Sequence, residues 1–184
     1  MLDELIEHLK QDAAEWEIAR NCFQERAIAP GTTLLREGEV SNYLHFIRKG
    51  CLRMWFNNDG KDITLQFFFE NQAVSSIESF LGRQPSLFNL ESIEASVIVS
   101  IRKEDFDALL QRHPEMKNGL FEMLLQRMGT YANLFLSRIK DKPRQRYEDL
   151  LKNYPEIVQR VPQHYIASYL GITPVSLSRI RNKK

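Results

Sequence analysis

The C-terminal stretch Val161-Pro-Gln-His-Tyr-Ile-Ala-Ser-Tyr-Leu-Gly-Ile-Thr-Pro-Val-Ser-Leu-Ser-Arg-Ile-Arg-Asn-Lys-Lys184 decides the fold of this 184-residue chain. Its apolar residues Ile166 and Leu170 lie four positions apart, as on one face of a helix. Gly171 follows, where a chain that leaves a helix can adopt a positive φ angle. Pro174 stands where a second helix can begin. The stretch therefore predicts two short helices joined by a glycine turn, which is the layout of a helix-turn-helix motif.

The second predicted helix offers polar and basic side chains on its outer face. Leu177 and Ile180 are three positions apart and are expected to face the first helix, after an N-terminal cap at Thr173. In a helix-turn-helix the second helix enters the DNA major groove, so its other side chains are expected to contact DNA. Arg179 and Arg181 are expected to point outward, and an arginine in the groove can bind guanine through O6 and N7. The predicted DNA-binding residues are Thr173, Ser176, Ser178, Arg179, Arg181, Lys183 and Lys184.

The charge distribution supports a polyanionic partner at this end of the chain. Residues 1–137 hold 14 Lys and Arg against 20 Asp and Glu, whereas residues 138–184 hold 11 against 4. The net charge of the whole chain is only +1, so its basic character is confined to the C-terminal quarter. A solvated charged tail is the alternative interpretation, which the helical spacing of apolar residues among the charges disfavours.

Residues 24–102 have a different pattern, which is typical of strands. Short runs rich in β-branched and aromatic residues are separated by turn signals such as Pro30-Gly31 and Asn58-Asp59-Gly60. Their spacing predicts an antiparallel sandwich or barrel that contains a tight hairpin at Asn58-Asp59-Gly60. The predicted strands are Thr32–Leu35, Tyr43–Arg48, Leu52–Phe56, Ile63–Phe69, Leu90–Glu94 and Ser96–Arg102.

Helical periodicity flanks the strand region on both sides. One helix is predicted over residues 2–22, a short helix ends near Pro114, and a long helix covers residues 115–141. A further short helix is predicted over residues 144–152, ending at Asn153-Tyr154-Pro155.

The long helix carries apolar residues in alternating steps of three and four, which is the pattern of a coiled-coil seam. We expect this seam to form a homodimer interface, because further apolar residues are left for a second face of the helix. Simple packing on the strand domain is the alternative. The predicted interface residues are Phe121, Leu124, Met128, Tyr131 and Phe135.

Cysteines, histidines and hydropathy argue against several other classes of protein. Cys22 and Cys51 lie far apart without a paired motif, so zinc and iron–sulfur sites are not expected. The four histidines fall in separate elements and no catalytic constellation stands out, so we expect neither an enzyme nor a metal site. The acidic, amphipathic N-terminus and the lack of a long apolar run predict a cytoplasmic protein with no signal peptide and no membrane contact.

The order of these parts resembles the CRP/FNR superfamily of bacterial transcriptional regulators, and most closely its short Bacteroidetes-type members. The resemblance rests on three β-roll segments, the long helix and the C-terminal motif: Pro30–Glu39, Tyr43–Gly50, Cys51–Trp55, the helix before Lys140, and Ile166–Pro174. It implies an α+β fold in which residues 1–113 form an antiparallel, jelly-roll-like β-roll of the cyclic-nucleotide-binding type, flanked by helices. Residues 114–141 would form the dimerisation helix, and residues 142–184 a small helix-turn-helix domain.

The resemblance also implies an effector site in the β-roll. Family members that bind cyclic AMP hold the ribose with a glutamate, and hold the cyclic phosphate with an arginine and a helix N-terminus. Glu78 matches the ribose ligand, but Pro85-Ser86-Leu87 stands where the family has Arg-Ser/Thr-Ala, and Arg83 is displaced. We therefore expect no cyclic AMP binding of the usual kind, and at most an unidentified small-molecule or nucleotide effector. The candidate effector residues are Glu78, Ser79, Arg83 and Ser86.

The C-terminal motif also departs from the family pattern. Pro174-Val175 replaces the usual base-contacting Arg-Glu pair, and the sequence ends at Lys184 with no β-wing after the second helix. Arg179 matches a later base-contacting arginine of the family. We expect a dimeric transcriptional regulator that binds a pseudo-palindromic double-stranded DNA site and, by the resemblance, contacts RNA polymerase. The alternative is a small-molecule-binding regulatory module whose shortened helix-turn-helix contacts protein.

Overall fold

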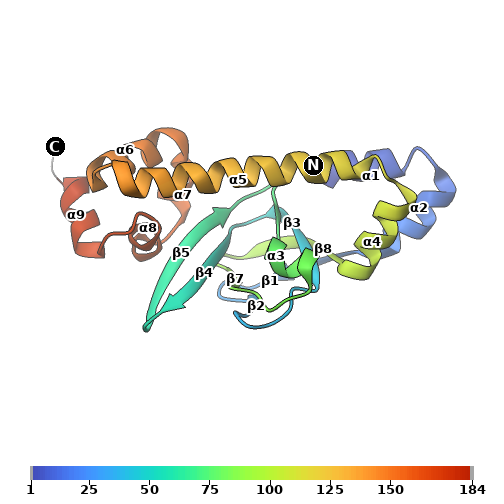
Figure 1. Cartoon of the computed structure of the whole chain (residues 1–184), viewed down its shortest axis with the longest axis horizontal. Coiled ribbons are helices and arrows are strands. Elements are labelled where there is room, and N and C mark those ends of the chain that lie inside the picture. Colours follow the sequence, from blue (N-terminus) through green and yellow to red (C-terminus); the bar gives the residue numbers. More distant parts are fainter. Residues whose placement is uncertain (1, 183–184) are drawn as a thin grey trace. The chain divides into compact units, whose positions relative to one another are not determined.

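The computed structural model of the chain describes residues 2–182. The chain divides into two compact units (Figure 1). The β-roll unit comprises residues 1–56 and 66–114, and the helical unit comprises residues 57–65 and 115–184. None of the described helices is long and apolar enough to cross a membrane.

Two four-stranded antiparallel sheets form the β-roll (Figure 1). The first sheet has the order β1 (Phe23–Ile28), β8 (Ser96–Arg102), β3 (Tyr43–Lys49), β6 (Ala73–Val74). The second has the order β2 (Thr33–Leu35), β7 (Asn89–Ser92), β4 (Leu52–Asn58), β5 (Lys61–Phe68). Most neighbouring strands are distant in sequence, as in a jelly roll, and the predicted antiparallel β-roll is therefore confirmed.

Apolar side chains from both sheets fill the core of this unit, and their removal from water is the main contribution to its stability. Across the β4–β7 pair, Met54 lies opposite Leu90, and both side chains are buried. The other core residues of the two sheets include Phe46, Ile47, Leu52, Val74, Ile98 and Ile101.

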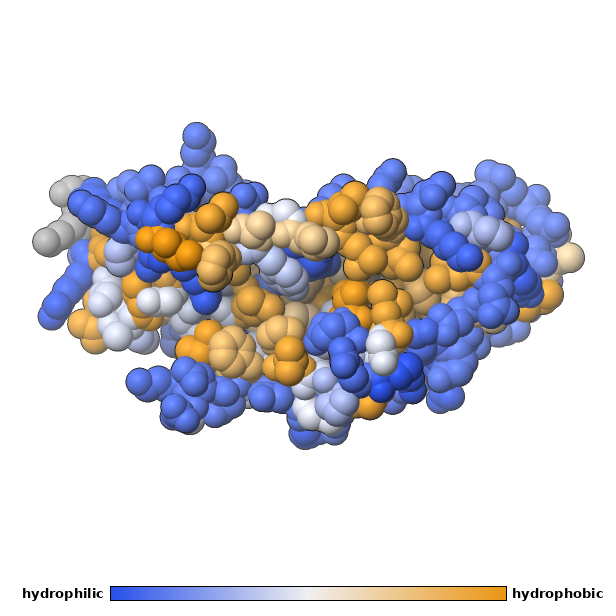
Figure 2. Space-filling model, in the orientation of Figure 1, coloured by the Kyte–Doolittle hydropathy of each residue, from blue (hydrophilic) through white to orange (hydrophobic). Residues whose placement is uncertain are grey.

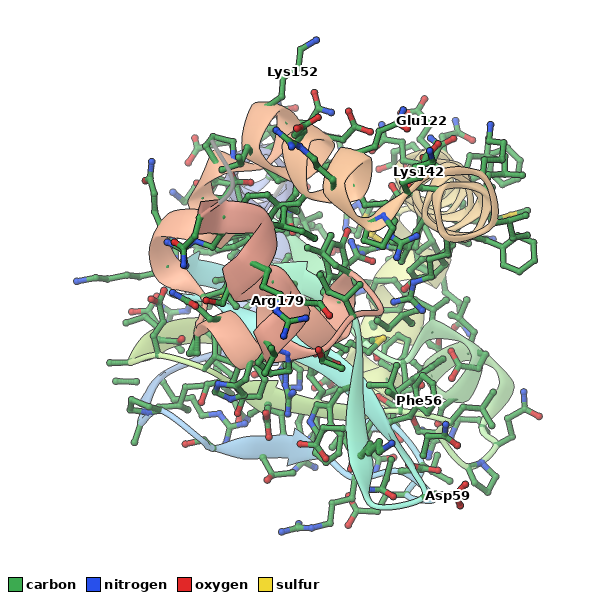
Figure 3. The ribbon with its side chains drawn as sticks, turned by 90° about the vertical axis from the view of Figure 1, so that its left-hand side faces the viewer. Phe56, Asp59, Glu122, Lys142, Lys152 and Arg179 are labelled. Atoms are coloured by element: carbon green, nitrogen blue, oxygen red, sulfur yellow. The ribbon has the colours of Figure 1, made fainter. Side chains whose placement is uncertain are left out.

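The six predicted strands are present, with no end shifted by more than two residues. The tight hairpin is also confirmed, because Asp59 (φ +52°) and Gly60 (φ +80°) form a two-residue turn between β4 and β5. Figure 3 shows Asp59 at the tip of this hairpin. The sequence did not predict β1, whose residues are mostly exposed, or the two-residue strand β6.

The N-terminal segment contains two helices, so the prediction of one helix over residues 2–22 is wrong. These helices are α1 (Leu2–Leu9) and α2 (Ala13–Ala19), followed by a 3₁₀ turn at Arg20–Cys22. Between the helices, the Asp12 carboxylate accepts hydrogen bonds from two backbone N–H groups of α2 at 2.8 and 3.2 Å. Asp12 is therefore an N-cap that starts a new helix, which apolar periodicity alone does not reveal.

The remaining helices follow the predicted order, with two additions. The short helices α3 (Ile77–Gly82) and α7 (Pro155–Arg160) were not predicted, and Pro155 begins a helix instead of closing a segment. The others lie close to their predicted bounds: α4 (Lys103–Arg112), α5 (Met116–Lys140), α6 (Pro143–Asn153), α8 (Gln163–Tyr169) and α9 (Pro174–Asn182).

His45 on β3 is a buried titratable group in the β-roll. Its Nδ1 lies 2.8 Å from Ser100 Oγ, and its ring stacks on Tyr43 with the centroids 5.9 Å apart. Burial lowers the pKa of His45 to about 3, and the positive charge of Arg26 adds to this effect. The imidazole is therefore neutral in the folded protein at all but strongly acidic pH.

The low pKa of His45 predicts a loss of stability in acid. An unfolded histidine has a pKa of about 6.5, so between about pH 6.5 and 3 the unfolded chain binds the additional proton. Lowering the pH through this range is expected to reduce the free energy of unfolding by about 1.4 kcal/mol per pH unit from this residue alone. Urea denaturation at a series of pH values measures this slope.

Two variants isolate the contribution of His45. His45→Gln is expected to remove that part of the slope, whereas His164→Gln changes an exposed histidine and is expected to leave the slope unchanged. An equal slope in the wild type and the His45→Gln variant would contradict the prediction.

Candidate nucleic-acid interface and effector site

The turn between α8 and α9 is fixed by backbone hydrogen bonds. The Gly171 N–H donates to Ser168 O at 3.0 Å, and the Ile172 N–H donates to Ala167 O at 2.9 Å. This pair of bonds is a Schellman motif, which requires a left-handed residue after the helix. Gly171 supplies it with φ +67°, and no atom lies within 4 Å of the place where a Cβ would stand. The glycine is therefore required by its backbone angle and not by lack of space.

The two helices pack through the apolar positions expected from the sequence. Leu177 of α9 is fully buried, and Ala167 of α8 has no exposed surface. At the start of α9, Thr173 Oγ1 accepts a hydrogen bond from Ser176 N at 3.1 Å, so the predicted N-cap is confirmed. The buried residues of the motif are Ile166, Ala167, Leu170 and Leu177.

The exposed face of α9 carries the predicted basic side chains. Ser178, Arg179 and Arg181 are all exposed. Figure 3 shows Arg179 at the front of the helical unit, where it projects from the motif. Val175 is also exposed, at the position of the family's usual charged pair. Lys183 and Lys184, the last two predicted DNA contacts, lie outside the described residues.

Ser176 does not point outward as expected from the sequence. Its side chain is half-buried, and its Oγ lies 2.9 Å from Thr173 Oγ1. Its hydroxyl and backbone N–H are thus both engaged in the cap of α9. A DNA contact from Ser176 stays a prediction, and one that would compete with this cap.

An apolar row runs along α5 on an exposed face (Figure 2). Five large hydrophobic side chains in this row are between 50% and 67% exposed, far more than is usual for such residues. Together with Ala132, they follow steps of four, three, four, three and four residues, which is the spacing of a coiled-coil seam. The row consists of Phe121, Leu125, Met128, Ala132, Phe135 and Ile139.

The exposed row differs from the predicted seam at two positions. Leu124 and Tyr131 are half-buried and belong to a different face of α5, where Tyr131 interacts with Arg127 one turn earlier. Leu125 and Ile139 take their place in the exposed row. Both sets of positions alternate in steps of three and four from Phe121, so the spacing in the sequence does not distinguish them.

Five buried serines lie together around α3 in the β-roll unit. Ser79 Oγ accepts a hydrogen bond from Ser41 N at 2.9 Å and donates one to Gln84 O at 2.5 Å. Ser41 Oγ in turn lies 2.9 Å from Ser75 Oγ. We call these residues the serine cluster: Ser41, Ser75, Ser76, Ser79 and Ser86.

The four predicted effector residues meet at this cluster. Ser76 Oγ donates to Glu78 Oε1 at 2.5 Å and lies 2.7 Å from Ser86 Oγ. Arg83 is the exposed C-cap of α3, with φ +55°, and its Nη1 donates to Ser41 O at 3.2 Å. The structure therefore brings the candidate residues together, and the three serine hydroxyls of Ser76, Ser79 and Ser86, one Glu78 oxygen and one Arg83 nitrogen are already engaged by the protein itself.

Comparison with known proteins identifies the β-roll. Residues 25–113 match the cyclic nucleotide-binding domain family. A curated relative is the cAMP-dependent protein kinase regulatory subunit of Blastocladiella emersonii, which is 20% identical over 115 residues. The match covers 62% of this chain and 28% of that protein, so the chain spans little more than a quarter of the relative's length.

Solved structures extend the similarity to both units. The c-di-GMP-responsive global regulator CLP of Xanthomonas campestris has a TM-score of 0.73 at 18% identity, covering 94% of this chain and 91% of that one. A putative transcriptional regulator of the CRP/FNR family from Eubacterium rectale has a TM-score of 0.74 at 16% identity, covering 92% and 81%. Residues 25–113 therefore match the cyclic nucleotide-binding domain family, and the chain has the fold of the CRP/FNR transcriptional regulators, as the resemblance drawn from its sequence implied.

Proposed function

We propose that this chain is a transcriptional regulator of the CRP/FNR type that binds double-stranded DNA through α9. The observation that carries the proposal is the exposed face of α9, where Ser178, Arg179 and Arg181 stand on a capped helix that packs on α8. A helix of this kind fits the major groove, where its exposed side chains can reach base edges and phosphates. The proposed activity is non-enzymatic.

The side chains of α9 divide into base contacts and phosphate contacts. Arg179 can bind guanine with two hydrogen bonds, which contributes about 1–3 kcal/mol of discrimination against other bases. Val175 is an exposed apolar group near the start of the helix, suited to the methyl group of thymine. Arg181 lies closer to the end of α9 and is assigned to the phosphate backbone. The excess of basic residues after position 137 supports a polyanionic partner.

Substitution of the two arginines separates these roles. Arg179→Ala is expected to relax the sequence preference at one base position, because a base contact is lost. Arg181→Ala is expected to weaken binding to all sequences alike and to reduce the slope of log affinity against log salt by about 1. Selection of sites from random DNA measures the preference, and binding titrations at several salt concentrations measure the slope.

The control is Arg20→Ala, which removes an exposed arginine of the β-roll unit that pairs with Glu17. It is expected to change neither quantity. An unchanged sequence preference in the Arg179→Ala variant would show that this residue does not contact bases.

We further propose that the apolar row of α5 is a homodimer seam. Exposed rows of large hydrophobic residues at heptad spacing are stabilised by a second copy of the helix. In a two-fold dimer each α9 would contact one half of a pseudo-palindromic site, with half-sites about 34–36 Å apart. Contact with RNA polymerase and a cytoplasmic location stay predictions from the sequence.

A charge placed in the seam tests the dimer. Phe135→Glu is expected to dissociate it, because each copy would then bury a carboxylate against an apolar partner. Sedimentation velocity measures the molecular mass of the 21.6 kDa chain or its dimer. Glu122→Gln is the matched control, since Glu122 is an exposed polar residue of α5 outside the row (Figure 3). A monomeric wild type, or a Phe135→Glu variant that stays dimeric, would contradict this seam.

The serine cluster disfavours cyclic AMP as the effector. A cyclic phosphate needs charge-assisted donors, and the arginine beside the cluster, Arg83, lies at the end of α3 and donates to Ser41 O. Ser76 Oγ already donates to Glu78, the residue that matches the ribose ligand. We propose that the β-roll either takes a different ligand or acts without one.

Calorimetric titration with cyclic AMP tests this proposal. The wild-type protein is expected to show no saturable binding at millimolar concentrations of the nucleotide. A double variant with Pro85→Arg and Leu87→Ala restores the family's Arg-Ser/Thr-Ala sequence around Ser86 and is expected to gain affinity. Micromolar binding of cyclic AMP to the wild type would refute the proposal.

The alternative function is a small-molecule-binding module whose helix-turn-helix contacts protein. The salt titrations described above discriminate between the two functions, because DNA binding weakens steeply with salt as counterions are released. Absence of DNA binding at low salt would favour the alternative.

A further inference from the structure

A cavity of about 410 Å³ lies within the helical unit, lined by the C-terminal part of α5, by α6 and by the end of α8. This volume is within the range of small-molecule sites. Its lining includes the arginines Arg138 and Arg146 and the tyrosines Tyr154 and Tyr169. The cavity belongs to a different part of the chain from the serine cluster of the β-roll.

Arg138, which lines this cavity, has one buried donor without a partner. Its Nη2 donates to Tyr169 O at 2.9 Å and to Thr64 O at 3.4 Å. Its Nε–H is buried and has no hydrogen-bond partner in the described structure. Burial lowers the pKa of the Arg138 guanidinium, the Tyr169 side chain opposes this shift, and the nearby positive charge of Arg146 adds to it. A buried donor on a cation is normally paired, so the hydrogen-bonding capacity of the Arg138 guanidinium is only partly used by the protein.

Arg146 is bonded in a similar way. Its Nε donates to Leu170 O at 3.1 Å, and its Nη1 donates to Asp141 O at 2.8 Å. In the described part of the chain, neither Arg138 nor Arg146 forms an ion pair with a carboxylate. Two guanidinium groups therefore line one cavity with only neutral backbone carbonyls as partners. An anion would offset their mutual repulsion.

The remaining polar lining limits what the anion can be. The carboxylates of Asp141 and Asp149 also line the cavity, together with the side-chain amides of Asn133 and Asn153. Carboxylates repel a ligand that is anionic throughout but accept hydrogen bonds from hydroxyl or amino groups. The lining thus suits a small molecule with one anionic group and separate hydrogen-bond donors.

We propose that this cavity binds a small organic anion, whose carboxylate or phosphate accepts hydrogen bonds from Arg138 and Arg146 and whose hydroxyl or amino groups meet the Asp and Asn side chains. The site is independent of the proposed DNA contacts of α9 and of any ligand of the β-roll. Because both arginines also hold the last carbonyls of α8, a bound anion would contact the groups that position the helix-turn-helix.

Calorimetric titration of the full chain with matched probes tests the site. Glycerol 3-phosphate and glycerate carry one phosphate and one carboxylate respectively, together with hydroxyl groups. Glycerol and methyl glycerate are their uncharged counterparts. Saturable binding of an anion, at least about tenfold tighter than its uncharged counterpart, is expected, and the tighter of the two anions identifies the preferred group.

Variants locate the binding in the cavity. Arg146→Gln and Arg138→Gln are each expected to weaken it about tenfold or more. Asn133→Trp narrows the cavity from an exposed position of α5, without removing either arginine, and is expected to abolish binding. Arg144→Gln is the matched control, because Arg144 lies on α6, pairs with Glu148 and does not line the cavity. The Nε–H NMR signal of Arg138 is expected to shift with the anion.

Several results would overturn the proposal. These are no saturable binding of either anion at millimolar concentration, equal binding of charged and uncharged probes, or binding that persists in the Asn133→Trp and Arg146→Gln variants. An Nε–H signal of Arg138 that is unmoved at saturation would overturn it as well. DNA binding by the same variants is measured separately, so failure of this site is distinguishable from failure of the DNA-binding proposal.

Discussion

The helical unit depends on two arginines that hold the end of α8. Arg138 of α5 and Arg146 of α6 donate to the carbonyls of Tyr169 and Leu170, which are among the last in that helix and would otherwise lack partners. A cation at a helix C-terminus also interacts favourably with the helix dipole. Arg146 bonds in addition to the carbonyl of Asp141, the C-cap of α5. The hydrogen bond from Arg138 therefore holds α8, the first helix of the helix-turn-helix, against α5, which carries the apolar row. If two copies join along that row, the spacing between their two α9 helices is set within this unit, and not by the β-roll.

That connection matters because α9 offers few groups for base recognition. Its first turn has Pro174 and Val175 where a charged pair is usual in the family, and Ser176 is engaged in the cap. Arg179 is then the main candidate for a base contact, and a single arginine–guanine pair gives only about 1–3 kcal/mol of discrimination. Two copies of the motif held at a fixed distance bind as one bivalent ligand, and their combined affinity far exceeds that of either copy. The proposed dimer seam would therefore matter more for DNA affinity here than in a regulator whose recognition helix makes many base contacts.

The features that could be predicted from the sequence are those that depend on residues close together in the chain. Glycine at position 171 allows the positive φ of the turn, and the Thr173 hydroxyl caps the next helix, so the helix-turn-helix could be predicted from the sequence. The face of α5 was harder, because Leu124 and Leu125 are adjacent and both fit steps of three and four. Only the fold determines which of them is covered. β1 was not predicted, because an exposed edge strand shows little alternation of apolar and polar residues. The cavity at Arg138 and Arg146 could not be foreseen, since it requires α5, α6 and α8 to be placed in space.

The serine cluster explains how this β-roll can keep its fold without a bound cyclic phosphate. In a phosphate site, backbone N–H groups and hydroxyls at a helix start point at the ligand and would be left unpaired without it. Here Ser41 N finds Ser79 Oγ across 38 positions of sequence, and the Ser86 N–H donates to Glu39 O at 2.8 Å. Because these donors already have partners within the protein, an empty site leaves them paired and does not destabilise the fold. A bound phosphate would have to break these hydrogen bonds, which would reduce its net binding free energy. This internal pairing supports the proposal that the β-roll acts without cyclic AMP, and it directs the search for a ligand to the cavity at Arg138 and Arg146.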